Sequence, residues 1–82
     1  MTAWIYKDTE LRGILEANDD PDNEEESVTN TVKQLIPHLK SKPYWKGFNA
    51  QRFRRAKTFY AFNRILDELF DFADANRIWI DF

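Results

Sequence analysis

Only two stretches of this 82-residue chain show the alternating pattern of a β-strand, and they lie at its opposite ends. Residues 3–7 (AWIYK) combine aromatic and β-branched side chains, and residues 77–82 (RIWIDF) alternate Ile, Ile and Phe with Trp and Asp. A single strand leaves its backbone hydrogen-bonding groups without partners. The two ends are therefore expected to pair as a two-stranded ribbon, and the rest of the chain must fold against it.

The chain after the first strand is predicted to form a short helix that ends near Ala17. Asp8 or Thr9 can cap this helix. Its apolar residues form one stripe: Leu11, Ile14 and Leu15. Gly13 lowers the helix propensity, so a β-hairpin over residues 3–16 remains the alternative.

A second helix is predicted to begin at Ser27, which can serve as its cap. Its apolar residues recur at helical spacing: Val28, Val32, Leu35, Ile36 and Leu39. Pro37 lies inside this stripe and removes one backbone hydrogen bond, which predicts a kink or an early end of the helix. Pro43 and Gly47 predict a loop over residues 41–48. Its aromatic residues are expected to fold back onto the core: Tyr44, Trp45 and Phe48.

The third and longest helix is predicted over residues 50–75, which contain neither Gly nor Pro, between a cap at Asn49 and an end at Asn76. Its core-facing arc comprises Phe59, Phe62, Ile65, Leu66, Leu69, Phe70, Phe72 and Ala73. The whole pattern predicts a predominantly helical α+β fold. One domain, residues 1–82, is expected in the order β-α-α-α-β, with the long helix as its spine.

Charge is strongly segregated along the chain, although the formal net charge is only −2. Residues 27–66 carry nine basic residues and no acidic one: Lys33, Lys40, Lys42, Lys46, Arg52, Arg54, Arg55, Lys57 and Arg64. Residues 1–26 carry nine acidic residues against two basic ones, and residues 67–82 carry five against one. Local fields steer polyanions and acidic proteins to a surface, so the basic block indicates a binding role.

The first half of the predicted long helix carries the candidate partner-binding face. Twenty-six residues of helix span ~39 Å, whereas a domain of this size is roughly 30 Å across. The basic start of the helix is therefore expected to project, or to be covered by the acidic N-terminal segment or by a partner. The candidate residues are Arg52, Phe53, Arg54, Arg55, Lys57, Tyr60 and Arg64.

The segment 18–26 (NDDPDNEEE) has no apolar residue and is predicted to be a solvated, mobile acidic loop. Its charged residues are Asp19, Asp20, Asp22, Glu24, Glu25 and Glu26. Two hypotheses apply to this loop: it folds over the basic helix, or it imitates phosphate charge in a basic groove of a target.

Several function classes have no support in the sequence. There is no cysteine, and His38 is the single histidine, so we expect no metal site; His38 is interpreted as a surface or boundary residue. We identify no catalytic residues, no phosphate-binding glycine loop and no cofactor signature. No apolar run approaches the ~20 residues that cross a bilayer, and the N-terminus lacks the features of a secretory signal. A cytoplasmic protein without a membrane partner is expected.

These features predict a small non-catalytic adaptor or inhibitor that binds a macromolecular partner, most simply a protein. By analogy only, such properties are typical of inhibitors made by phages and other mobile elements. The alternative is a nucleic-acid-binding regulatory protein that uses the basic segment 40–64. A homodimer is compatible with either function.

Overall fold

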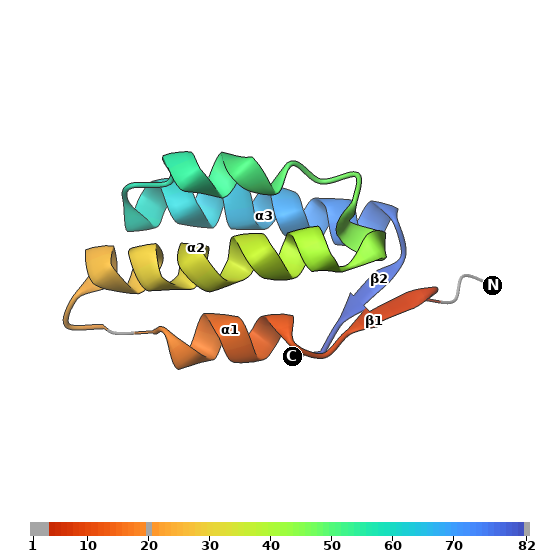
Figure 1. Ribbon diagram of the computed structural model, residues 1–82, viewed down its shortest axis with the longest axis horizontal. Helices are drawn as coiled ribbons and strands as arrows, with labels where there is room; N and C mark the ends of the chain where they lie inside the picture. Colours follow the sequence, from red (N-terminus) through yellow and green to blue (C-terminus); the bar gives the residue numbers. More distant parts are fainter. Residues whose placement is uncertain (1–3, 20, 82) are drawn as a thin grey trace.

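The computed structural model describes residues 4–19 and 21–81, which form an elongated body of 43 × 21 × 21 Å. Its elements, in chain order, are β1 (Tyr6–Asp8), α1 (Leu11–Ala17), α2 (Glu24–Ser41), the 3₁₀ helices η1 (Pro43–Trp45) and η2 (Ala50–Arg55), α3 (Phe59–Ala75) and β2 (Ile78–Ile80). The helices α1, α2 and α3 run along the long axis, and the strands lie at one end (Figure 1). The predominantly helical α+β fold is thus confirmed.

The two ends of the chain pair as expected. β1 and β2 form a parallel two-stranded sheet in which Tyr6 lies opposite Ile78 and Asp8 opposite Ile80. The outermost residues of the predicted strands, residues 3 and 82, lie outside the described part of the chain. The turn into β2 is made by Arg77, which has a φ of 58°, and not by Asn76, which is the C-cap of α3.

The segment after β1 is a helix and not the second strand of a hairpin. The Oδ1 atom of Asp8 accepts hydrogen bonds from the backbone N–H groups of Glu10 and Leu11, each at 3.0 Å. These two groups lie at the start of α1, where backbone donors have no partner within the helix. Leu11 is fully buried, and Ile14 and Leu15 pack against the core. The N-cap of α1 is Glu10 and not Asp8 or Thr9, but the hydrogen bonds from Asp8 and the burial of the apolar stripe offset the weak helix propensity of Gly13.

Helix α2 begins earlier and ends later than the sequence predicts. Its N-cap is Asn23 and not Ser27: Asn23 Oδ1 accepts a hydrogen bond from the Glu26 N–H at 3.1 Å. The carboxylates of the first turn favour this earlier start, because negative charge is stabilised at a helix N-terminus. The predicted early end at Pro37 is wrong, since α2 continues to Ser41. Burial of Ile36 and Leu39 on either side compensates the lost backbone hydrogen bond.

The predicted continuous helix over residues 50–75 is wrong in its first third. Residues 50–55 form η2, the chain then extends, and α3 begins at Phe59 with Thr58 as its N-cap (Thr58 Oγ1 to Ala61 N–H, 3.0 Å). A 3₁₀ helix has three residues per turn, so Ala50, Phe53 and Ala56 all face inward and are buried. One continuous α-helix would instead turn Phe53 to the solvent side.

The core lies between α2, α3 and the η1–η2 segment. Phe62, Leu66 and Leu69 of α3 are buried as the periodicity predicts, with exposed fractions of 6%, 9% and 0%. Phe59, expected on the same arc, is 47% exposed because it is the first residue of α3. The folding back of the 41–48 aromatic residues is confirmed: Trp45 is buried, and Tyr44 and Phe48 pack against the core. No helix in the described part of the chain is long and apolar enough to cross a bilayer.

Candidate functional site

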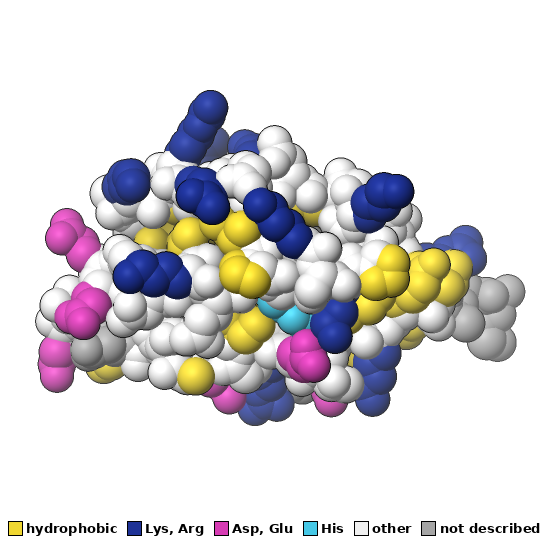
Figure 2. All heavy atoms as spheres, viewed as in Figure 1, with side chains coloured by type: hydrophobic (Ala, Val, Ile, Leu, Met, Phe, Trp, Pro, Cys, Tyr) yellow, Lys and Arg dark blue, Asp and Glu magenta, His cyan; other side chains and the backbone are white. Residues whose placement is uncertain are grey.

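Six of the nine residues in the basic block gather along α2 and the η1–η2 segment. Figure 2 shows lysine and arginine side chains spread over α2 and the η1–η2 segment, with hydrophobic side chains visible between them. Acidic side chains gather at the end of this view where α2 begins. Further acidic side chains lie along the lower edge of this view, one of them beside the histidine, so the upper part of this face is the basic part.

Three adjoining hollows form a groove between α2 and the η1–η2 segment. Their volumes are about 470, 370 and 250 Å³. Lys40 lines both the first and the second hollow, and Val32, Lys33 and Arg54 line both the second and the third. We refer to these three hollows together as the basic groove.

Six cationic side chains line the basic groove: Lys33, Lys40, Lys42, Lys46, Arg54 and Lys57. Within residues 4–19 and 21–81, no acidic residue lines any of the three hollows. Among the described residues, Lys42 alone of these six forms a salt bridge, with Glu10 at 3.2 Å. The remaining charges are not neutralised by the fold, so they generate a positive field that attracts acidic partners.

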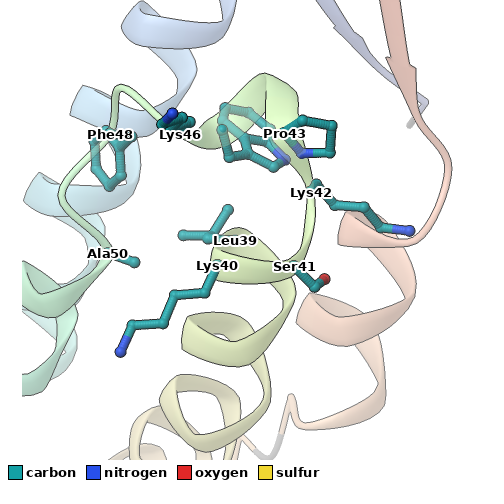
Figure 3. Close-up of a pocket in the computed structure, with 9 residues that line it drawn as sticks. Leu39, Lys40, Ser41, Lys42, Pro43, Lys46, Phe48 and Ala50 are labelled. Carbon is teal, nitrogen blue, oxygen red and sulfur yellow. The ribbon is translucent and has the colours of Figure 1, made fainter.

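The floor of the groove is apolar. Figure 3 shows the largest hollow, with Leu39 of α2 between Pro43 and Ala50, while Lys40 and Lys42 extend to opposite sides. Ile36 and Val32 continue the apolar floor along α2. On the side of η2, Ala50 lines the first hollow, and Phe53 and Ala56 line the third.

The end of the groove at η1 is held by a buried polar cluster around Asp8. Asp8 is 1% exposed, and its Oδ2 atom accepts hydrogen bonds from Trp45 Nε1 at 2.7 Å and from His38 Nε2 at 2.6 Å. His38 Nδ1 lies 3.2 Å from Glu10 Oε2. Since Trp45 also lines the largest hollow, Asp8 fixes one wall of the groove.

This cluster shifts the pKa values of two of its members. Burial raises the pKa of Asp8, but hydrogen bonds from Trp45, His38 and the Glu10 backbone outweigh it and hold the pKa below its ordinary value of 3.8. For Tyr44, burial followed by the nearby charge of Asp8 raises the pKa to about 12. The folded environment therefore favours the ionised form of Asp8 and the neutral form of Tyr44.

The predicted partner-binding residues do not form one face. Phe53 is fully buried and packs on Phe62, with ring centroids 5.6 Å apart. Arg52 turns to α3, where its Nη1 atom lies 2.5 Å from Glu68 Oε1. The cause is the break in the helix at residues 56–58, which ends the regular spacing from which the face was inferred.

The other five members of the predicted set lie in three different places. Arg54 and Lys57 line the basic groove. Tyr60 is 69% exposed on α3, with the guanidinium carbon of Arg64 at 5.9 Å from its ring centroid. Arg55 is exposed and lines none of the three hollows.

The predicted acidic loop is shorter than nine residues. Glu24, Glu25 and Glu26 form the first turn of α2, and only the preceding residues connect the helices. Asp19 and Asp22 are exposed, and Asp20 lies outside the described residues. No acidic residue of 18–26 lines the basic groove, so the hypothesis that this segment covers the basic surface has no support among the described residues.

Four groove lysines were missing from the predicted partner-binding set: Lys33, Lys40, Lys42 and Lys46. Lys33 and Lys40 lie seven residues apart, beside the apolar stripe of α2, and this spacing could have revealed them. His38 was also misplaced, because it is buried and not on the surface. Its partner Asp8 is 30 positions away, so no local pattern connects the two.

Within residues 4–19 and 21–81, no cluster of three or more His, Asp or Glu side chains is placed to hold a metal ion. Comparisons with protein-family models, with curated proteins and with solved structures find no match for this chain.

Proposed function

We propose that this protein is a small non-catalytic interaction protein, an adaptor or inhibitor, that binds an acidic segment of another protein in the basic groove. The observation that carries the proposal is the groove itself. Of the side chains that the structure describes, six cationic ones and no acidic one line it. Its floor is made of apolar side chains from α2 and the η1–η2 segment.

The combination of a charged rim and an apolar floor selects a partner with both properties. An amphipathic helix can lay an apolar face into such a groove while its acidic residues meet the basic rim. Charge complementarity of this kind speeds association and suppresses wrong partners, whereas the apolar contacts supply most of the affinity. The matching partner is therefore a segment that carries Asp or Glu together with Leu, Ile or Phe at helical spacing.

A protein partner is favoured over single-stranded nucleic acid by the placement of the aromatic rings. Stacking on bases requires exposed aromatic faces within a basic surface. Among the aromatic residues that line the groove, Trp45 is 1% exposed and Phe53 is fully buried, so only the half-buried ring of Phe48 is left for a base to stack on. Duplex nucleic acid, which is bound through phosphates alone, is the competing outcome.

The proposal can be tested with a fluorescent peptide in which Glu and Leu recur at helical spacing, compared with a peptide in which Lys replaces Glu. The expected result is saturable binding of the acidic peptide only. Reversing three groove charges together (Lys33→Glu, Lys40→Glu and Arg54→Glu) should weaken binding by about tenfold or more.

A matched control reverses three charges outside the groove: Lys7→Glu, Arg55→Glu and Arg64→Glu. This control has the same net charge as the groove variant and should bind the acidic peptide nearly as well as the unmodified protein. Equal losses in both variants would show that net charge and not the groove is responsible, which would overturn the proposal. Tighter binding of labelled duplex DNA or RNA than of the peptide, with log Kd rising steeply with log salt, would support the nucleic-acid function instead.

A further inference from the structure

Large hydrophobic side chains are exposed at the end of the molecule that carries the sheet. They are Trp4, Ile5, Tyr6 and Trp79, four of the six exposed large hydrophobic residues in the described part of the chain. The rings of Trp4 and Trp79 meet edge to face with centroids 5.4 Å apart, yet they remain 47% and 42% exposed. An exposed patch of this kind marks an interaction surface.

The strand β2 has an open edge at this surface. The sheet consists of β1 and β2 within residues 4–19 and 21–81, so β2 has a strand neighbour on one side only. All three residues of β2 line a hollow of about 360 Å³, together with Trp4 and with Phe70, Ala73 and Asp74. An open strand edge offers backbone donors and acceptors to a further strand.

The sequence of this strand and its flanks, RIWID over residues 77–81, is self-complementary. In an antiparallel pairing of two copies, Trp79 lies opposite Trp79 of the second copy. Ile78 then lies opposite Ile80. Arg77, the turn residue just before β2, comes near Asp81, which follows β2 in the second copy. Because of the twofold axis, the Ile78–Ile80 contact and the Arg77–Asp81 contact each occur twice. This register places apolar side chains against apolar side chains and opposite charges near each other. Such cross-strand pairs stabilise a sheet.

We propose that two copies of this chain associate through β2 to form a twofold-symmetric dimer with the strand order β1-β2-β2-β1. A twofold interface uses the same patch on both copies and must therefore be complementary to itself. The charges that flank β2 meet this requirement, whereas two basic grooves would repel each other. None of the described residues lines both the groove and the hollow beside β2, so the dimer is independent of the proposed function.

The test is sedimentation equilibrium of the purified chain over a range of concentrations. The unmodified protein should show a monomer–dimer equilibrium. Arg77→Asp places two pairs of like charges in the interface and should raise the dissociation constant roughly tenfold, and Asp81→Arg should do the same. Aspartate tolerates the left-handed backbone conformation at position 77, so the fold should persist; circular dichroism checks this.

The decisive measurement is a mixture of the two single variants. In an Arg77→Asp and Asp81→Arg heterodimer every flanking pair is again of opposite charge, so mixing should restore association to about the unmodified level. The control Arg55→Asp, which changes an exposed charge on η2, should have no effect on association. A chain that stays monomeric at all concentrations would overturn the proposal. A dimer whose dissociation constant is unchanged in both single variants would also overturn it, and so would a mixture of the two variants that associates no better than either alone.

Discussion

Asp8 and His38 lie 30 positions apart in the chain and meet in the interior, where His38 Nε2 is 2.6 Å from Asp8 Oδ2. The same carboxylate accepts hydrogen bonds from Trp45 Nε1 and from the Leu11 backbone N–H. One ionised side chain therefore joins β1, α1, α2 and η1. It fixes the start of α1 and one wall of the basic groove together, so its loss should affect both stability and binding.

Asp8→Asn should lower the free energy of unfolding by about 2–4 kcal/mol. The substitution keeps the shape of the side chain but removes the charge that accepts from Trp45 and His38 in a buried site. Chemical denaturation measures the loss. The control Glu10→Gln, at a carboxylate that is 58% exposed, should cost less than about 1 kcal/mol. Equal losses in the two variants would contradict the role of Asp8.

Stability should fall in acid partly through Asp8. Its pKa in the fold is lowered, so its contribution is fully present above its ordinary value of 3.8 and is lost as the pH falls through the lower value. The free energy of unfolding measured from pH 6 to pH 2 should therefore decline less steeply in Asp8→Asn than in the unmodified protein. Parallel pH profiles for the two proteins would contradict the lowered pKa.

Tyr44 should make the fold sensitive to alkali. Because its pKa rises from 10.0 to about 12 on folding, the neutral phenol is favoured in the folded state. Its contribution is complete below pH 10, declines as the pH rises from there and is lost above about 12. Tyr44→Phe cannot ionise, so this variant should lose less stability between pH 9 and 12. Ultraviolet titration of the phenolate gives the pKa directly, and a value near 10 would contradict this prediction.

Phe53 and Tyr60 should behave in opposite ways, although the sequence pattern places them on one face. Phe53→Ala removes a fully buried ring and should cost about 3–5 kcal/mol of unfolding free energy. Tyr60→Ala removes a ring that is 69% exposed and should change stability by less than about 0.5 kcal/mol. A continuous helix over residues 50–75 would instead leave both substitutions mild, so denaturation midpoints distinguish the two geometries.

Thr58→Ala should destabilise the start of α3. The Thr58 hydroxyl accepts a hydrogen bond from the Ala61 N–H, and loss of such a cap costs about 1 kcal/mol. Thr9→Ala, at an exposed threonine that caps no helix, is the control and should change stability by less than about 0.5 kcal/mol. If residues 56–58 were inside a continuous helix, Thr58→Ala would stabilise the protein, since Ala has the higher helix propensity.

The sequence by itself determined the features that depend on local pattern. The apolar stripes of α2 and α3 came from helical periodicity, and burial of Val28, Leu35 and Leu69 follows from it. The pairing of the chain ends followed from elimination, because no other segment could satisfy the backbone of either strand. Charge segregation likewise predicted a basic surface, since no acidic residue lies between residues 27 and 66.

Only the tertiary structure decided where the long helix breaks and what the basic surface encloses. A stretch without Gly or Pro has no local reason to stop at Arg55, but burial of Phe53 between Phe48 and Phe62 outweighs the loss of one or two helical turns. The groove requires α2 and η2 to lie side by side, and the cluster around Asp8 joins residues distant in sequence. The helix propensity of one residue contributes little free energy and acts only through its neighbours in sequence. Removing a buried ring or a buried carboxylate changes the free energy of unfolding by several kcal/mol at a single position. The partners of such a group are set by the fold and not by the local sequence.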